Sequence, residues 1–215
     1  MKNRYKIAAL LLLLVAGIAG VLFGQQVQQQ AAAARSRQLA QVEIMGKPQV
    51  TQKQAVAYIK RRNPSPKLNC SVEELVDYYY QEAGSEGIRP DLALSQAIKE
   101  TGCFAYGGDV SPQQNNYCGL GTTGAGVKGY TFSRPQQGVR AHIQHLLAYA
   151  TKRPPQQDIM DPRYQLLREK HPEFFGKVTT WVGLNGKWAV PGEHYGQDIL
   201  HIGEEMKREN GQPEE

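Results

Sequence analysis

The spacing of apolar positions along the chain predicts a helical protein. From residue 51 onward, apolar residues recur every three or four positions in short segments, as on one buried face of a helix. Breakers and caps bound these segments: two prolines close the first, and Ser71 with Glu74 forms a capping box before the second. The expected helices are residues 51–62, 72–84, 90–102, 138–150, 164–170 and 195–207, with residues 178–182 as an extension of the fifth. Almost no strand is expected.

The first part of the chain has a different pattern. Lys2, Arg4 and Lys6 precede an uncharged apolar run, residues 7–24, which is the arrangement of a bacterial export signal. As a helix this run is about 27 Å long, at about 1.5 Å per residue, and nearly matches the hydrocarbon core of a membrane. We therefore expect an N-terminal membrane anchor with the rest of the chain outside the cytoplasm. Cleavage near the alanines of residues 31–34 would instead give a secreted protein.

Composition divides the rest of the chain. Residues 25–47 are rich in Gln and Ala and lack aromatic residues, which predicts a tether that does not fold alone. We expect one folded, monomeric domain over residues 48–210 and a frayed tail over residues 211–215. Hydrophobic residues make up 40% and charged residues 21% of the chain, as in globular proteins. The mean hydropathy of -0.51 excludes a polytopic membrane protein.

The charge of the chain favours an anionic partner. The formal net charge is +5, which suits nucleic acid, acidic lipid or bacterial wall polymer. The export signal and the absence of a basic helix count against nucleic acid. Three cysteines are too few for a disulfide scaffold.

Three motifs carry little weight. Gly119 begins a Gly-x-Gly-x-x-Gly string, but no apolar strand precedes it and no helix follows, as a dinucleotide site requires. His142 and His145 share one expected helix without a third ligand at a zinc-site spacing, so we expect no metal. Cys103 lacks the surrounding signature of a catalytic thiol.

The stronger signal is a carboxylic acid at the end of an apolar helix. Glu100 lies in the last turn of the third expected helix, before the glycine-rich segment 103–135. Partial desolvation in such a position raises the pKa of a carboxyl and keeps it protonated as a general acid. Cleavage of a glycosidic bond requires such an acid.

Three segments extend this observation to a family. "QAIKETG" (96–102), "NNYCGLGTTG" (115–124) and "GKWAVPGEHYGQDI" (186–199) resemble, in this order, the glucosaminidase domains of glycoside hydrolase family 73. These are bacterial cell-wall hydrolases with a lysozyme-like helical fold, and the resemblance covers roughly residues 50–208. It implies a mostly α domain with a glycine-rich cleft loop, and it needs neither metal nor cofactor.

The resemblance also implies roles for residues. Glu100 would be the general acid, and Tyr195 the cleft tyrosine at the start of the last helix. The loop lining the sugar cleft would contain Asn115, Asn116 and Gly119. Tyr106, in the same glycine-rich segment, is a further candidate for substrate binding.

The implied reaction is hydrolysis of the β-1,4 bond after N-acetylglucosamine in peptidoglycan. The second catalytic group stays open: Asp109 is the first candidate, Glu193 another, and the N-acetyl group of the substrate can replace both. A lytic transglycosylase and a non-catalytic wall-binding module remain alternatives on the same fold.

The chain departs from its relatives at two cysteines. Cys103 and Cys118 stand where many relatives have an aromatic and an apolar residue. In an oxidising compartment we expect these two to form a disulfide across the cleft loop, which leaves Cys70 free.

Overall fold

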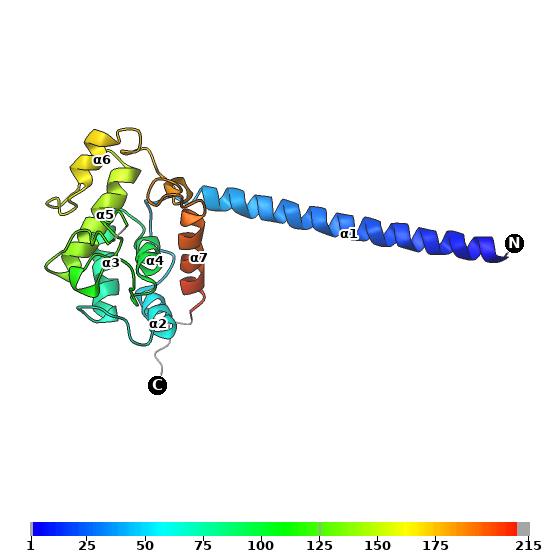
Figure 1. The fold of residues 1–215 in the computed structure, drawn as a ribbon, viewed down its shortest axis with the longest axis horizontal. Helices are drawn as coiled ribbons and strands as arrows, with labels where there is room; N and C mark the ends of the chain where they lie inside the picture. The colour runs from blue at the N-terminus through cyan, green and yellow to red at the C-terminus, as the bar shows by residue number, and fades with distance from the viewer. Residues whose placement is uncertain (1, 125, 210–215) are drawn as a thin grey trace. The chain divides into compact units, whose positions relative to one another are not determined.

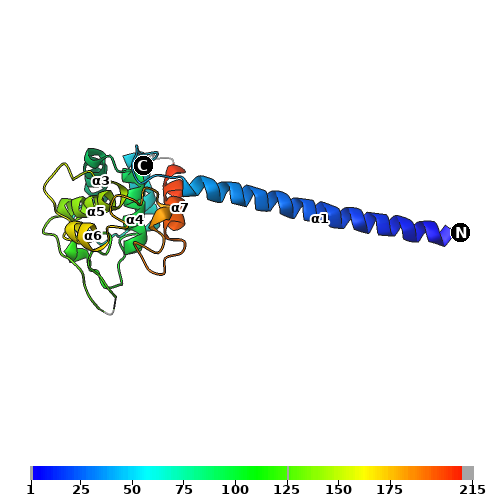
Figure 2. The same cartoon turned by 90° about the horizontal axis from the view of Figure 1, so that it is seen from above.

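The computed structural model describes residues 2–124 and 126–209, with side chains from residue 20 onward. The chain divides into two compact units, one up to Gln41 and one from Val42. The first unit is a single helix, α1 (Lys2–Ala40), drawn in blue in Figures 1 and 2. Between residues 20 and 38 its side chains are exposed, including those of Leu22 and Phe23.

The predicted anchor falls mainly on residues whose side chains lie outside the described part of the chain. Of the apolar run 7–24, only residues 20–24 have described side chains. Judged on the described residues, no helix combines the length and apolar character that a membrane crossing requires. The anchor therefore stays a prediction.

The second unit is helical, as the apolar spacing predicts. Among the described residues there are no strands, only three isolated backbone bridges. The helices of this unit are α2 (Gln52–Arg62), α3 (Val72–Glu86), α4 (Pro90–Thr101), η1 (Pro112–Gln114), α5 (Pro135–Ala150), α6 (Tyr164–Lys170), η2 (Val182–Leu184) and α7 (Tyr195–Lys207). A mostly α fold is confirmed, and the lysozyme-like arrangement remains a prediction.

Local sequence explains most of the helix ends. Capping boxes open α2 at Thr51 and α3 at Ser71. Helix α4 begins with Pro90 at its first turn and ends at Gly102, which has a left-handed φ of 58°. This stop leaves Glu100 in the last turn of α4.

Three predicted boundaries differ from the structure. Helix α3 continues past Gly84 to Glu86, because Gly87, with φ 71°, supplies the left-handed cap. Helix α5 begins at Pro135, since a proline is tolerated in the first turn of a helix. Residues 178–181 do not extend α6, because Thr179 and Trp181 bond to the backbone of residues 42–44 instead.

The compact unit also begins earlier than residue 48. Ile44 is 0% exposed, its N–H donates to the Thr179 carbonyl at 2.8 Å, and its own carbonyl accepts from Arg89 N–H at 3.0 Å. The lack of aromatic residues in the segment misled the prediction, since one buried Ile and paired backbone suffice to attach it.

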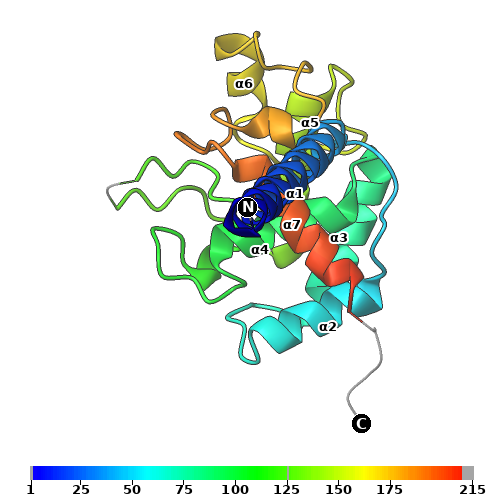
Figure 3. The same ribbon diagram turned by 90° about the vertical axis from the view of Figure 1, so that its right-hand side faces the viewer.

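Helix α4 lies in the middle of the second unit. It packs against α3 on one side and α7 on the other, and α3 in turn packs against α5 (Figures 1 and 3). Ten of its 12 residues are buried, and only Lys99 and Glu100 near its C-terminus are not. The central helix thus delivers one acidic side chain to the surface of the unit.

Candidate active site

The Glu100 side chain lines a cleft beside the end of α4. The cleft has a volume of about 250 Å³. Three segments line it, namely the end of α4, the loop that follows it and the turn after Cys118. The lining residues are Glu100, Thr101, Gly102, Tyr106, Gly108, Asp109, Val110, Gly119 and Thr122.

Tyr195 holds one oxygen of the Glu100 carboxyl. Helix α7 begins at Tyr195, and its packing against α4 brings the tyrosine hydroxyl to the last turn of α4. The hydroxyl donates to Glu100 Oε1 and accepts from Gln96 Nε2 at 2.7 Å. Tyr195 is 4% exposed, so the donor side of this hydrogen bond is buried. The structure therefore brings together the two residues that the resemblance pairs.

The environment of Glu100 raises the pKa of its carboxyl. Desolvation by the surrounding protein raises the pKa of the carboxyl above its usual value. The hydrogen bond from Tyr195 and the charge of Lys99 act in the opposite direction and are smaller. The side chain still reaches the solvent of the cleft, so the carboxyl is at once accessible and poorly solvated. An accessible carboxyl with a raised pKa suits the role of a general acid.

Gly119 forms a wall of bare backbone opposite Glu100. A Cβ at Gly119 would lie 3.9 Å from Glu100 Oε2 and 3.2 Å from Thr122 Oγ1. Its φ of 67° suits glycine. Thr122 closes the turn, since its N–H and hydroxyl both donate to the Gly119 carbonyl, at 3.1 and 2.8 Å. The second oxygen of Glu100, Oε2, thus lies beside Gly119, and both residues line the cleft.

Asp109 lies in the lining of the same cleft as Glu100. Its Oδ1 accepts from Gly126 N–H at 3.1 Å, which ties the loop after α4 to the glycine-rich turn. Glu193, the other carboxylate considered, is exposed and is not in this lining. Of the two protein candidates for a second group, only Asp109 faces the cleft with Glu100.

Asn115 and Asn116 are buried under the cleft loop, and their side chains do not line it. Asn116 Nδ2 donates to the carbonyls of Leu120 and Tyr130, and its Oδ1 accepts from Leu120 N–H, at 2.9 to 3.1 Å. Asn115 Nδ2 donates to the Phe132 carbonyl at 2.8 Å. In this structure the two amides hold the backbone that carries Gly119, and their contact with sugar stays a prediction.

Tyr106 lines the cleft, but its hydroxyl is turned into the protein. The oxygen is buried and has no hydrogen-bond partner among the described residues. The backbone of Tyr106 is left-handed, with φ 58°. Burial raises the pKa of this phenol. A sugar in the cleft would meet the other atoms of Tyr106 and not its hydroxyl.

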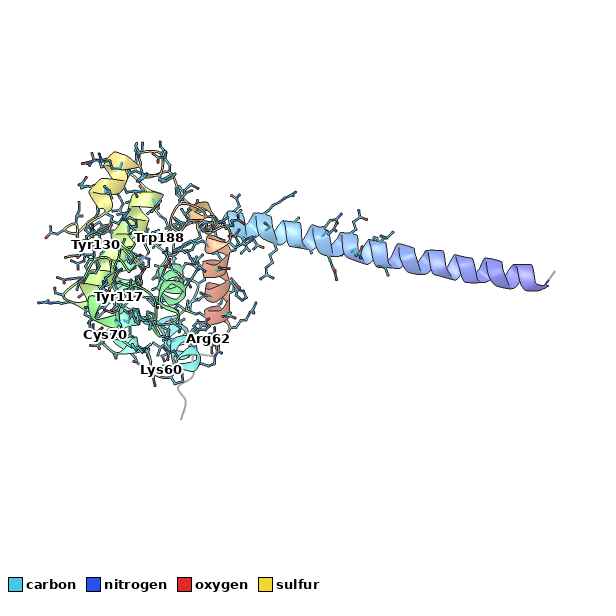
Figure 4. The ribbon with its side chains drawn as sticks, viewed as in Figure 1. Lys60, Arg62, Cys70, Tyr117, Tyr130 and Trp188 are labelled. Atoms are coloured by element: carbon cyan, nitrogen blue, oxygen red, sulfur yellow. The ribbon has the colours of Figure 1, made fainter. Side chains whose placement is uncertain are left out.

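The predicted disulfide is not present. Cys70, Cys103 and Cys118 are free thiols, and the three have different neighbours. Cys103 Sγ faces the Ile59 carbonyl of α2 at 4.0 Å. Cys118 is buried in a cluster with Leu120, Phe132 and Ala141, against which Trp188 packs. Cys70 lies just before α3. Figure 4 labels Cys70 and also Trp188, which packs against the Cys118 cluster. Spacing around the loop suggested the pairing, but the loop turns the two sulfur atoms to different neighbours.

The sequence reasoning missed Gln96. It lies four residues before Glu100, and residues at this spacing share one face of a helix. A polar residue one turn before a candidate acid, on an otherwise buried helix, was the available signal. His142, considered above as a metal ligand, hydrogen-bonds to this glutamine instead, with 2.9 Å between Nε2 and Oε1.

Comparison with known proteins gives the family of the chain. Residues 76–208 match the glucosaminidase family, described as mannosyl-glycoprotein endo-beta-N-acetylglucosaminidase, and the chain belongs to this family of glycoside hydrolases. An uncharacterized protein of Borreliella burgdorferi (strain ATCC 35210) is 37% identical over 134 residues. The match covers 62% of this chain and 62% of that protein. No solved structure matches the chain.

Proposed function

We propose that the protein hydrolyses peptidoglycan at the β-1,4 bond after N-acetylglucosamine, with Glu100 as the general acid. The observation that carries the proposal is the arrangement of the Glu100 carboxyl. One oxygen accepts from Tyr195, the other faces the bare backbone of Gly119, and desolvation raises the pKa of the group. Membership of the glucosaminidase family supports the class of substrate.

In the proposed reaction Glu100 gives its proton to the glycosidic oxygen as the bond to the anomeric carbon breaks. Water then supplies a hydroxyl group to that carbon, and its remaining proton passes to a base. Asp109 is the proposed base or nucleophile, because it lines the cleft with Glu100. Attack by the N-acetyl group of the substrate is the alternative route.

We further propose that the protein acts outside the cytoplasm as a monomer anchored through residues 7–24. The basic residues before the apolar run support this orientation. Separation of cell membranes from the culture medium, followed by detection of the protein, tests the proposal. Recovery of the intact chain from the cytosol would contradict it.

Glu100→Gln tests the proposed function most directly. The amide is nearly isosteric but has no proton to give, so hydrolysis should fall by about 10²- to 10⁴-fold. Purified peptidoglycan is digested and the new chain ends are identified by mass spectrometry. The matched control is Glu169→Gln, at an exposed carboxyl of α6, which should leave the rate unchanged.

The products separate the alternatives. Reducing N-acetylglucosamine ends are expected, whereas anhydro sugar ends would identify a lytic transglycosylase. A wild-type protein that binds peptidoglycan without cleaving it would be a wall-binding module. Asp109→Asn should lower the rate as much as Glu100→Gln if Asp109 is the base or nucleophile. A mild effect would favour the N-acetyl route.

A further inference from the structure

A continuous chain of hydrogen bonds runs from the interior of the second unit to the Glu100 carboxyl. Tyr79 meets His142 at 2.9 Å between its hydroxyl and Nδ1, and His142 Nε2 meets Gln96 Oε1 at 2.9 Å. Gln96 Nε2 then donates to the Tyr195 hydroxyl, which donates to Glu100. We call Tyr79, His142, Gln96 and Tyr195 the relay.

The relay joins four helices at their common interior. Its residues come from α3, α5, α4 and α7 in that order. Tyr79, His142 and Gln96 are 0% exposed, so water does not compete for these hydrogen bonds. A buried donor or acceptor without a partner is costly, and each member therefore constrains the next.

The direction of the hydrogen bonds is fixed from the far end. Among the described residues, the Tyr79 hydroxyl has His142 as its one hydrogen-bond partner, so it must donate to Nδ1 if its proton is to be satisfied. Burial and the neighbouring His145 lower the pKa of His142 to about 3, so the ring is neutral. A neutral ring that accepts at Nδ1 carries its proton on Nε2, and Nε2 donates to Gln96 Oε1.

This direction decides what Tyr195 does. With its carbonyl oxygen held by His142, Gln96 can offer only its NH₂ group to Tyr195. The Tyr195 oxygen is then an acceptor toward Gln96, and its own proton points to Glu100 Oε1. If the amide of Gln96 were reversed, Tyr195 would donate to Gln96, and Glu100 would lose its hydrogen-bond donor.

We infer that Tyr79, His142 and Gln96 are positioning residues that keep Tyr195 as a donor to Oε1, so that Glu100 carries its transferable proton on Oε2, the oxygen beside Gly119 in the lining of the cleft. The inference rests on the proposed function, because it concerns the proton that Glu100 transfers. None of the three positioning residues lines the cleft.

The pH dependence of hydrolysis gives a signature of this role. A hydrogen bond donated to a carboxylate lowers its pKa, so loss of the Tyr195 donor should raise the pKa of Glu100. Because Glu100 acts in its protonated form, the alkaline limb of the rate profile should then move to higher pH. Other groups around Glu100 are Lys99, Cys118 and Asp109, and the variants below leave all of them in place.

Two variants in the full-length chain test the inference. Tyr79→Phe keeps the ring but removes the proton that fixes the direction, and His142→Leu removes the donor to Gln96. We expect kcat to fall by about 10-fold or more in each, as for the loss of one hydrogen bond in a buried network, with KM unchanged. The alkaline limb should shift upward in both.

Rescue and control variants separate positioning from folding. His142→Gln retains an N–H donor near the position of Nε2 and should recover most of the lost kcat. The control His201→Leu, at an exposed position of α7, should match the wild type. Circular dichroism establishes whether each variant is folded. If His142→Leu does not fold, the inference is tested with Tyr79→Phe alone.

Wild-type kcat and an unshifted alkaline limb in folded Tyr79→Phe would overturn the inference. So would a fall in kcat that His142→Gln does not rescue. If the wild type cleaves no peptidoglycan, the proposed function fails. The relay is then tested by measuring the pKa of the Glu100 carboxyl with a ¹³C NMR titration of wild type and Tyr79→Phe. A higher pKa in Tyr79→Phe then supports the relay, and an unchanged pKa overturns it.

Discussion

Two buried glutamates on α3, Glu82 and Glu86, have different hydrogen-bond partners from Glu100 at the end of α4. Glu82 is buried on α3 and receives two hydrogen bonds from Arg140, both at 2.9 Å. Glu86, one turn further along α3, accepts from Arg153 at 3.1 Å and from Gln156 N–H at 2.8 Å. Glu100 accepts from the hydroxyl of Tyr195, a neutral group, and no arginine among the described residues pairs with it.

The difference lies in how the charge of each carboxylate is compensated. An arginine partner stabilises the ionised form and makes the residue part of the packing. A neutral donor in a desolvated position leaves the proton on the carboxyl available for transfer. The comparison predicts that the α3 glutamates determine stability, whereas Glu100 determines rate.

The largest effect on stability is expected when a buried pair is broken. Arg140→Met leaves Glu82 buried without its cation and should reduce the free energy of unfolding by about 3 kcal/mol. This is the lower end of the usual range, because the Arg140 side chain is 24% exposed. Urea denaturation measures the change, and kcat of the folded fraction should stay near the wild-type value.

Two controls complete this comparison. Arg168→Met, at an exposed position of α6, should leave stability unchanged. Glu100→Gln should leave the urea midpoint unchanged or raise it, although it removes activity. A large loss of activity in folded Arg140→Met would break the proposed division of roles.

Acid should destabilise the protein through His142. The pKa of the buried ring is lowered to about 3, whereas an unfolded chain has a histidine pKa of about 6.5. Between these values the unfolded state binds the extra proton, so stability present above pH 6.5 is lost as the pH falls. The slope is about 1.4 kcal/mol per pH unit for one proton. Thermal unfolding of wild type and His142→Gln between pH 7 and pH 4.5 measures it; equal slopes would contradict the assignment.

Gly119→Ala should reduce the rate of hydrolysis by roughly 10-fold, which corresponds to about 1.4 kcal/mol on the activation barrier. The added methyl would sit 3.9 Å from Glu100 Oε2, where the substrate oxygen has to approach. Gly124→Ala is the matched control, because its φ is also positive but no atom lies within 4 Å of the new Cβ. Both variants should lose similar stability through backbone strain, and only Gly119→Ala should lose kcat/KM. If both variants lost the same kcat/KM, the loss would come from strain in the loop and not from the methyl group beside Glu100.

The smallest effect is expected from reductants. With three free thiols, dithiothreitol should change neither the unfolding temperature nor the rate of hydrolysis. Alkylation of the unfolded, unreduced protein should label Cys70, Cys103 and Cys118 alike. Labelling of only one cysteine would show that the other two form a disulfide, contrary to the structure.

Local signals in the sequence predicted the helices well and the loop contacts poorly. Pro90 at the first turn and the glycine stop at Gly102 are local signals that put Glu100 in the last turn of a helix. The resemblance added Tyr195 as its partner. The backbone contacts of Asn115 and Asn116 could not be predicted, because polar residues in a glycine-rich loop look the same whether they face a ligand or the backbone.

The sequence by itself determined that the domain is helical, where most helices begin and end, and that an acid stands at the end of the central one. These follow from neighbours within four residues, where caps, glycine and apolar spacing act. Only the tertiary structure decided that Cys103 and Cys118 have different neighbours, that Ile44 belongs to the compact unit, and that Glu82 pairs with an arginine whereas Glu100 accepts from a tyrosine. Charge compensation and burial depend on residues dozens of positions apart in the chain, which no local pattern encodes.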